Sequence, residues 1–225
     1  MNKWIRRKRN SHGYGVQSPT DFYFVQHVLR EEMPYYGYHE LQQAEGRFPI
    51  SQPQYAMPIN RMLFRLANYV HPQQMIEVGT GSGLAAYAMA MAVPSGRCTT
   101  IDSPHQQAGE VASALAHLEQ VTVLNGDEMA LYSQLLQQVD AVELLHVAYT
   151  SHYREVVEMA LPRVTDRSLF IIEGIDADAD KRTWWRALQE SQLTGVSYDV
   201  GSVGLLFFDK ARYKDMYWVS LRKHS

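Results

Sequence analysis

The chain has 225 residues, of which 46% are hydrophobic and 20% are charged, and this composition is typical of a globular α/β domain with appended segments. Its formal net charge of −3 gives the molecule as a whole no bias toward nucleic acid. The single cysteine, Cys98, excludes an internal disulfide, and no apolar stretch is long enough for a secretory leader or a membrane-spanning helix. We therefore expect a cytoplasmic protein that has no membrane partner.

The first part of the chain differs in pattern from the rest, and we expect residues 1–55 to form a basic arm followed by a helical lid. The stretch "KWIRRKR" (3–9) carries five basic residues, and residues 1–18 as a whole predict a flexible arm. A helical pattern begins at Thr20, which can cap the helix. The stretch 33–54, which is rich in proline, glycine and aromatic residues, predicts a loop.

Two roles are open for residues 10–55. As a lid over a ligand site, the segment would present three tyrosines, whose rings are apolar and whose tips are polar. These are Tyr35, Tyr36 and Tyr38, which could line an acceptor pocket or simply pack the loop. The alternative role is dimerisation through apolar side chains such as Phe22, Phe24 and Val28.

The remaining chain, residues 56–225, predicts one α/β domain. After an amphipathic helix over 57–70, strand-like apolar runs alternate with helical patterns through short connections, which predicts a Rossmann-like, doubly wound, mostly parallel sheet. These runs are 75–79, 98–102, 121–127, 139–147 and 168–175. The stretch 195–208 predicts a terminal hairpin around Gly201, and 216–222 is a candidate for a further strand. We predict a seven-stranded sheet whose last strand is antiparallel.

The connection between the first predicted strand and its helix, "EVGTGSG", contains three glycines within five positions. Such a turn lets the backbone approach a ligand closely and directs free helix N–H groups at an anion. The dinucleotide fingerprint would need a glycine at Leu84, whereas here the third glycine is Gly83. Glycines can also serve close packing of helix on sheet. That explanation leaves unexplained Glu77, two residues before the first glycine, and Asp102, which ends the next strand.

With these residues the chain resembles the class I S-adenosylmethionine-dependent methyltransferases. In that family the glycine turn faces the methionine half of the cofactor, and an acid ending the second strand holds both ribose hydroxyls. The resemblance implies this role for Asp102, which lies 23 positions after Gly79, and it implies that Asp127 meets the adenine amino group. The predicted cofactor-binding residues are Glu77, Gly79, Thr80, Gly81, Ser82, Gly83, Asp102, Ser103, Gly126 and Asp127.

The resemblance extends along nearly the whole chain. The stretches "SHGYGVQSPTDFYFVQHVL", "YYGYHELQQAE" and "VGLLFF" are similar to segments of a group of bacterial methyltransferases common in Bacteroidetes. That group has no settled substrate, so the resemblance implies the architecture and leaves the acceptor open.

Related small-molecule O-methyltransferases bind a divalent cation through an aspartate that ends the fourth strand and through further ligands after the fifth. The resemblance places the first of these positions at Leu145, which cannot bind a hard cation. Four acids could rebuild a site, namely Glu173, Asp176, Asp178 and Asp180. An acidic loop that caps the helix from about Asp178 is the favoured interpretation, and we predict no metal.

Methyl transfer requires alignment of the acceptor with the methyl group and, for some acceptors, removal of a proton. His146 and His152 flank the end of the fourth predicted strand, with Tyr149 between them. The predicted catalytic residues are His146, as a base suited to neutral pH, and Tyr149. A histidine that is simply hydrogen-bonded within the structure is the alternative for His146.

The sequence thus predicts a methyltransferase that uses S-adenosylmethionine to methylate a small molecule, with O-methyl transfer favoured and no metal. One alternative is a cofactor-binding module that has lost catalysis. Another is an RNA methyltransferase that uses the basic arm. Against the latter, "HVAY" (146–149) is not the Asn/Asp-Pro-Pro-aromatic motif of many nucleic-acid methyltransferases. Nucleic acid is therefore not expected as a partner, and a homodimer stays open.

Overall fold

The computed structural model describes residues 3–31, 33–49, 53–148 and 150–221. The chain divides into two compact units. The first, called here the glycine-turn unit, is Met33–Arg163. The second, the hairpin unit, combines Met1–Glu32 with Val164–Ser225. Each unit is described by itself.

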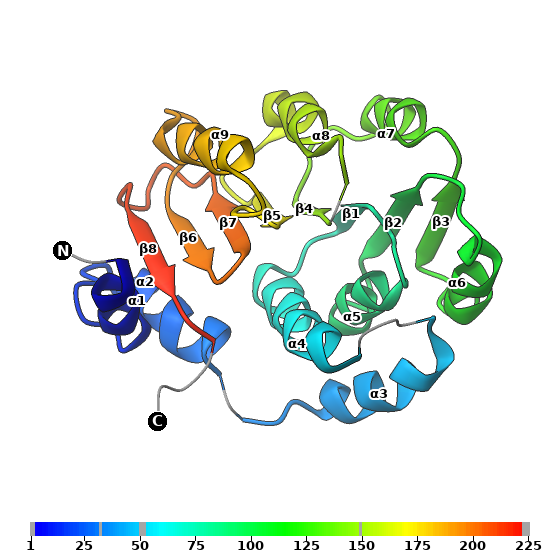
Figure 1. Ribbon diagram of the computed structural model, residues 1–225, viewed down its shortest axis with the longest axis horizontal. Coiled ribbons are helices and arrows are strands. Elements are labelled where there is room, and N and C mark those ends of the chain that lie inside the picture. The colour runs from blue at the N-terminus through cyan, green and yellow to red at the C-terminus, as the bar shows by residue number, and fades with distance from the viewer. Residues whose placement is uncertain (1–2, 32, 50–52, 149, 222–225) are drawn as a thin grey trace. The chain divides into compact units, whose positions relative to one another are not determined.

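Four parallel strands form the centre of the glycine-turn unit, in the order β3-β2-β1-β4. Their bounds are Gln74–Val78 (β1), Arg97–Asp102 (β2), Val121–Asn125 (β3) and Leu144–Val147 (β4). The helices of this unit are α3 (Tyr36–Ala44), α4 (Pro53–Val70), α5 (Leu84–Ala92), α6 (Ala108–Leu115), α7 (Glu128–Leu136) and α8 (Tyr153–Ala160), with short 3-10 helices at Glu45–Arg47 and Leu161–Arg163. Figure 1 shows α4 and α5 on one face of these strands and α7 and α8 on the other.

Helix α5 explains how this layer is built. Its sequence "LAAYAMAMA" is apolar on all sides, which is typical of a helix that is buried all round. The structure places α5 against β2, β3 and α4, and Leu63, Leu66 and Ala67 of α4 are buried. The strand–helix alternation predicted for this part of the chain is therefore confirmed.

The segment predicted as a loop over 33–54 contains helix α3 instead. Its buried residues Tyr38, Leu41 and Ala44 recur every three positions and form one face of the helix. The Tyr38 hydroxyl accepts a hydrogen bond from Arg65 Nη1 at 2.7 Å. Tyr38 therefore packs this segment against α4, whereas the side chain of Tyr36 is 75% exposed.

The hairpin unit contains the other four strands, in the order β5-β7-β6-β8. Their bounds are Leu169–Glu173 (β5), Ser197–Val200 (β6), Val203–Phe207 (β7) and Met216–Val219 (β8), and the helices are α1 (Lys3–Ser11), α2 (Pro19–Phe24), which continues as a π-helix over Val25–Leu29, and α9 (Ala179–Glu190). Strand β7 is antiparallel to β5 and β6, and β8 is parallel to β6. The predicted hairpin around Gly201 is confirmed, and β8 adds an eighth strand to the seven predicted. The mostly parallel, Rossmann-like fold is confirmed as well.

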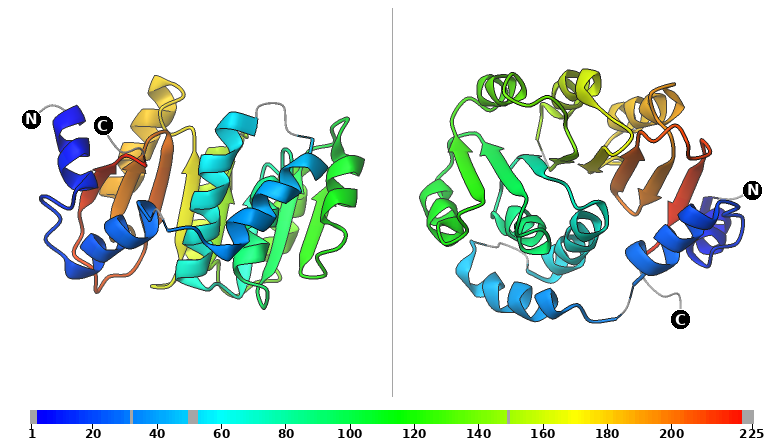
Figure 2. Two further views of the ribbon diagram at one scale, coloured as in Figure 1. Left: turned by 90° about the horizontal axis from the view of Figure 1, so that it is seen from below. Right: turned by 180° about the vertical axis from the view of Figure 1, so that it is seen from behind.

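Strand β6 shows why α2 and α9 cover opposite faces of these strands (Figure 2). Successive strand residues point to opposite faces. The ring centroid of Tyr198 lies 4.9 Å from that of Phe24 on α2. The next residue, Asp199, points to the other face and accepts a hydrogen bond from Trp185 Nε1 of α9 at 2.7 Å. Gly204 on β7 lets Trp185 approach, because a Cβ there would lie 2.5 Å from the indole ring.

Helix α1 packs against strand β8 within the hairpin unit, although the sequence predicts a flexible arm for residues 1–18. Asn10 and Ser11 accept hydrogen bonds from the backbone N–H groups of Trp218 (3.2 Å) and Ser220 (2.8 Å). Helix α1 thus satisfies donors on strand β8 and just after it, groups that an edge strand would otherwise expose. Helix α2 begins at Pro19 with Ser18 as its cap, two residues before the predicted cap.

The candidate dimerisation residue Phe24 lies in this core. Its side chain is 0% exposed and contacts the rings of Tyr198 and Phe207. Phe22, by contrast, is 44% exposed. Within the described residues, no helix combines the length and the apolar character that a membrane span would need.

Candidate functional site

The glycine turn connects β1 to α5 through three residues with positive φ. These are Gly79 (91°), Gly81 (53°) and Gly83 (82°). Gly83 is the N-cap of α5 and has the left-handed backbone conformation. Residues other than glycine adopt this conformation at a cost in free energy. A Cβ at Gly81 would meet nothing within 4 Å, so its backbone conformation, rather than crowding, favours glycine there. Ser82 Oγ accepts a hydrogen bond from the Leu84 N–H at 3.4 Å.

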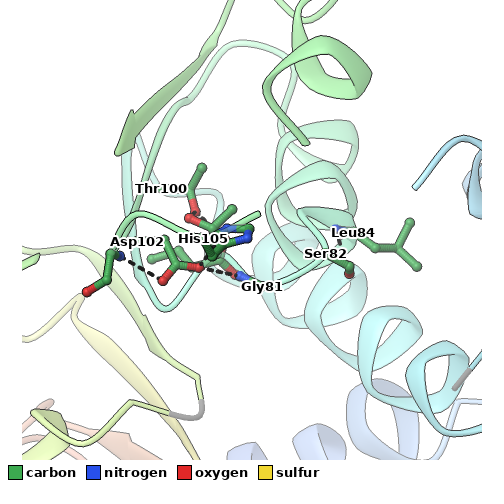
Figure 3. Close-up of polar contacts among 9 residues, drawn as sticks. Gly81, Ser82, Leu84, Thr100, Asp102 and His105 are labelled. Carbon is green, nitrogen blue, oxygen red and sulfur yellow. Dashed lines mark hydrogen bonds and ion pairs between the residues drawn. The ribbon is translucent and has the colours of Figure 1, made fainter. Parts of the chain in front are cut away.

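Asp102, the last residue of β2, lies at this turn (Figure 3). Its Oδ2 accepts a hydrogen bond from the Gly81 N–H at 2.9 Å, and its Oδ1 accepts one from the Ser103 N–H at 2.8 Å. His105 Nε2 is 3.5 Å from Oδ2. The Asp102 side chain is 20% exposed, and a carboxylate has about four acceptor positions, so it can accept further hydrogen bonds. The structure therefore brings together the turn and the acid that the sequence predicts.

The third predicted element of the site follows β3. The Gly126 N–H donates to the Asp102 backbone carbonyl at 3.0 Å, which places the ends of β2 and β3 side by side. The exposed Asp127 is the N-cap of α7, because its Oδ1 accepts a hydrogen bond from the Ala130 N–H at 2.9 Å. The sequence did not predict this capping role.

Glu77 lies inside the core beneath the turn, with 0% exposure. Its Oε2 accepts a hydrogen bond from Thr100 Oγ1 at 2.5 Å, and Thr100 is also hydrogen-bonded to Thr80 Oγ1 at 2.7 Å. Its Oε1 is 2.8 Å from His146 Nδ1. Thr100 and Thr80 thus connect Glu77 to the turn, and the predicted contact of Glu77 with the cofactor stays a prediction.

His146 is 1% exposed on β4, and its imidazole is directed at Glu77. This geometry matches the alternative in which His146 is hydrogen-bonded structure. Tyr149 lies outside the described residues. Cys98 lies near the same carboxylate, and burial, followed by the negative charge of Glu77, raises the pKa of the Cys98 thiol well above its usual value. Cys98 is therefore a protonated core residue.

The positions at which related O-methyltransferases hold a metal lie in both units of this chain. Leu145 is 0% exposed in the core of the glycine-turn unit. In the hairpin unit Asp178 is the N-cap of α9, because its Oδ1 accepts a hydrogen bond from the Lys181 N–H at 2.7 Å. The predicted capping role of the acidic loop is therefore confirmed. Lys181 Nζ donates to the Glu173 carbonyl at 2.8 Å, and burial lowers the pKa of its ammonium group.

In the described part of the chain, no three or more His, Cys, Asp or Glu residues are grouped so that they could hold a metal ion. A cavity of about 870 Å³ lies along β2, β3 and α7. Its lining includes Gln74, Arg97 and Gln120, which lie at the amino ends of the strands. From these amino ends it extends along β3 to Leu124 and Leu131, and none of the predicted cofactor-binding residues lines it.

Sequence reasoning did not select Glu128 or Thr150, which lie after β3 and β4, respectively. In the sequence, Glu128 is visible as an acid that directly follows "NGD", in the first turn of a helix. An acid at that position usually serves only to interact favourably with the helix dipole. Their partner in the structure, His152, is visible in the sequence beside the candidates that were chosen.

No protein-family model matches the chain, and no curated protein matches it in sequence. Solved structures do match it. The O-methyltransferase TomG from Streptomyces achromogenes, involved in tomaymycin synthesis and crystallised with S-adenosylmethionine, has a TM-score of 0.60 and 19% identity over 92% of this chain and 99% of its own. An O-methyltransferase from Bacillus cereus in complex with S-adenosylhomocysteine has a TM-score of 0.58 and 16% identity over 81% and 96%. A methyltransferase from Geobacter sulfurreducens has a TM-score of 0.58 and 19% identity over 82% and 94%.

The chain shares the fold of these methyltransferases. At such low identity the likeness establishes the fold, and the chemistry has to be argued from this chain's own residues.

Proposed function

We propose that this protein is an S-adenosylmethionine-dependent methyltransferase that methylates a hydroxyl group of a small molecule without a metal. The observation that carries the proposal is the 2.9 Å hydrogen bond between the Gly81 N–H and the Asp102 carboxylate. It joins a positive-φ glycine turn to an acid at the carboxyl ends of parallel strands, where α/β folds bind nucleotides. The bound cofactors of the TomG and Bacillus cereus structures support the same ligand.

The residues present suit this cofactor. Gly81 is exposed and has no side chain, so the methionine half can approach the backbone closely. The partly exposed Asp102 carboxylate can accept from two vicinal ribose hydroxyls, and Gly126 and Asp127 border the place where adenine would lie. Bound there, the cofactor supplies a methyl group that is already activated by its sulfonium. The chain has to orient the acceptor and remove its proton.

Part of the predicted lid adjoins this site within the glycine-turn unit. A Cβ at Gly83 would lie 3.5 Å from the Phe48 ring, and Phe48 also contacts the Tyr87 ring of α5 at 5.4 Å. Arg47 donates to the Tyr87 hydroxyl at 3.2 Å. We therefore retain residues 33–49 as the part of the lid that borders the start of α5.

A module that has lost catalysis is the second candidate, because the predicted base His146 is buried against Glu77 and Leu145 replaces the usual aspartate. The two candidates differ in turnover alone. Purified protein should be incubated with S-adenosylmethionine and a panel of phenols and catechols in the presence of a chelator, and S-adenosylhomocysteine should be measured by mass spectrometry. Formation above the acceptor-free rate supports the enzyme. Tight binding of the cofactor without turnover of any acceptor supports the module.

A further inference from the structure

A second polar cluster lies in the glycine-turn unit where β3 and β4 end, and we call it the Glu128 cluster (Glu128, Thr150 and His152). Glu128 is the first residue of α7, and the other two lie between β4 and α8. Thr150 Oγ1 donates to Glu128 Oε1 at 2.6 Å, and His152 Nδ1 is 3.1 Å from the same oxygen. The His152 backbone N–H donates to Thr150 Oγ1 at 3.1 Å and closes the ring of contacts.

The two ends of this cluster differ in burial. The Glu128 side chain is 6% exposed, whereas the His152 side chain is 46% exposed. An ionised carboxylate only accepts hydrogen bonds, so Nδ1 of the neutral imidazole must carry the proton that it donates to Glu128. Nε2 then holds the lone pair, and among the described residues it has no hydrogen-bond partner. A carboxylate that fixes the tautomer and orientation of an exposed imidazole is an arrangement suited to a general base.

The cluster borders the proposed cofactor site on two sides. The Ala148 N–H donates to the Val78 carbonyl at 3.0 Å, and a Cβ at Gly79 would lie 3.2 Å from that of Ala148. The connection that carries Thr150 and His152 therefore starts against the glycine turn. On the other side, Glu128 directly follows Gly126 and Asp127. Because β3, β2, β1 and β4 are parallel, all of these residues follow strands at the same edge.

We propose that His152 is the general base of the methyl transfer and that Glu128 positions it, an inference that rests on the proposed function. His152 Nε2 takes the proton of the acceptor hydroxyl as the acceptor oxygen forms its bond to the methyl carbon. The methyl–sulfur bond breaks, its electron pair stays on sulfur, and the positive charge passes from the sulfonium to the imidazolium. Glu128 stabilises that imidazolium through Nδ1. The exposed His152 thus takes the role that the sequence assigns to the buried His146.

A purely structural clasp between α7 and the connection after β4 is the competing explanation. Such a clasp needs the bond between Thr150 and Glu128, which persists without an imidazole. Substitution of His152 by glutamine should then leave kcat intact. A general base would instead be needed most by acceptors whose hydroxyl is protonated at neutral pH.

The first test needs no acceptor. In the cofactor-free protein, the ring nitrogens of His152 can be observed by long-range ¹H–¹⁵N NMR and assigned by loss of the signal in His152→Gln. At a pH where the ring is neutral, we expect the Nδ1–H tautomer. A dominant Nε2–H tautomer would overturn the assignment, because Nε2 would then be unable to accept a proton.

The second test compares two acceptors, catechol and 4-nitrocatechol, of which the second is largely ionised at neutral pH. His152→Gln should lower kcat for catechol by roughly 10²- to 10⁴-fold and for 4-nitrocatechol by much less, with an unchanged Kd for the cofactor. Glu128→Gln should act in the same direction and more weakly. His117→Gln, at an exposed histidine of the same unit, is the matched control and should behave as wild type.

Equal losses for both acceptors, or wild-type turnover by His152→Gln, would refute the role of His152. If the wild-type protein binds the cofactor but methylates no acceptor, the proposed function fails instead. The tautomer measurement then decides by itself whether Glu128 and His152 form the poised pair.

Discussion

Replacement of Asp102 by alanine tests the ribose-binding role. Asp102 Oδ1 accepts a hydrogen bond from the Ser103 N–H, and Oδ2 accepts one from the Gly81 N–H. Each oxygen can accept another hydrogen bond on the solvent side. A hydrogen bond to a charged group contributes about 1.5–3 kcal/mol, and competition with water at this partly exposed side chain lowers its net value. We therefore expect Asp102→Ala to weaken cofactor binding by about 1–3 kcal/mol, which is roughly 5- to 150-fold in Kd.

The measurement is isothermal titration of the wild type and variants with S-adenosylhomocysteine. Asp102→Asn keeps the shape of the side chain and one acceptor oxygen, so its Kd should lie between those of the wild type and Asp102→Ala. Asp140→Ala, at an exposed acid of the same unit, is the control for loss of a negative charge. If Asp102→Ala is folded by circular dichroism and binds as tightly as wild type, Asp102 does not hold the ribose.

Three further predictions concern the metal, the hairpin unit and the glycine turn. Turnover should survive EDTA, because Leu145 removes the usual first ligand; loss of activity that magnesium restores would contradict this. Arg212→Ala should lower the free energy of unfolding by about 3–5 kcal/mol, since it leaves the fully buried Asp21 without its guanidinium partner. Urea denaturation measures this, and a double variant with Asp21→Asn should recover part of the loss. Gly83→Ala should lower the free energy of unfolding by about 1–3 kcal/mol, because the new Cβ would lie 2.7 Å from a side-chain carbon of α6. The loss should exceed that of Gly81→Ala, whose Cβ would meet no atom within 4 Å. Equal unfolding midpoints of the two variants would refute the packing argument.

The position of the basic arm in the fold could not be predicted from the sequence. Polarity and charge predict a solvated segment, and α1 is indeed polar. In the structure it accepts two hydrogen bonds, from the Trp218 N–H of strand β8 and from the Ser220 N–H just after it, more than 200 residues later in the chain. The same limit applies to Asp21. In the sequence, Asp21 is an ordinary acid in the first turn of a helix. In the structure it accepts a hydrogen bond from the Tyr198 hydroxyl at 2.7 Å and forms an ion pair with Arg212.

The glycine turn and Asp102 could be predicted because each depends on local features. Positive φ is a property of single glycines, and an acid that ends a strand is placed by the length of that strand. Side-chain periodicity likewise determines which runs form strands and which form helices, and the hairpin around Gly201 follows from two adjacent runs.

The tertiary structure alone decided which strands are neighbours, and the chemistry of the histidines depends on that order. Pairing of β1 with β4 brings Glu77 to His146 across 69 positions. The segments after β3 and β4, two strands that β2 and β1 separate in the sheet, bring Glu128 to His152 across 24. Periodicity records which face of each strand is buried and contains no information on the strand beside it. The sequence by itself therefore determined the fold class and the residues of the turn, whereas only the folded arrangement assigned one histidine to the core and left the other exposed beside a buried carboxylate.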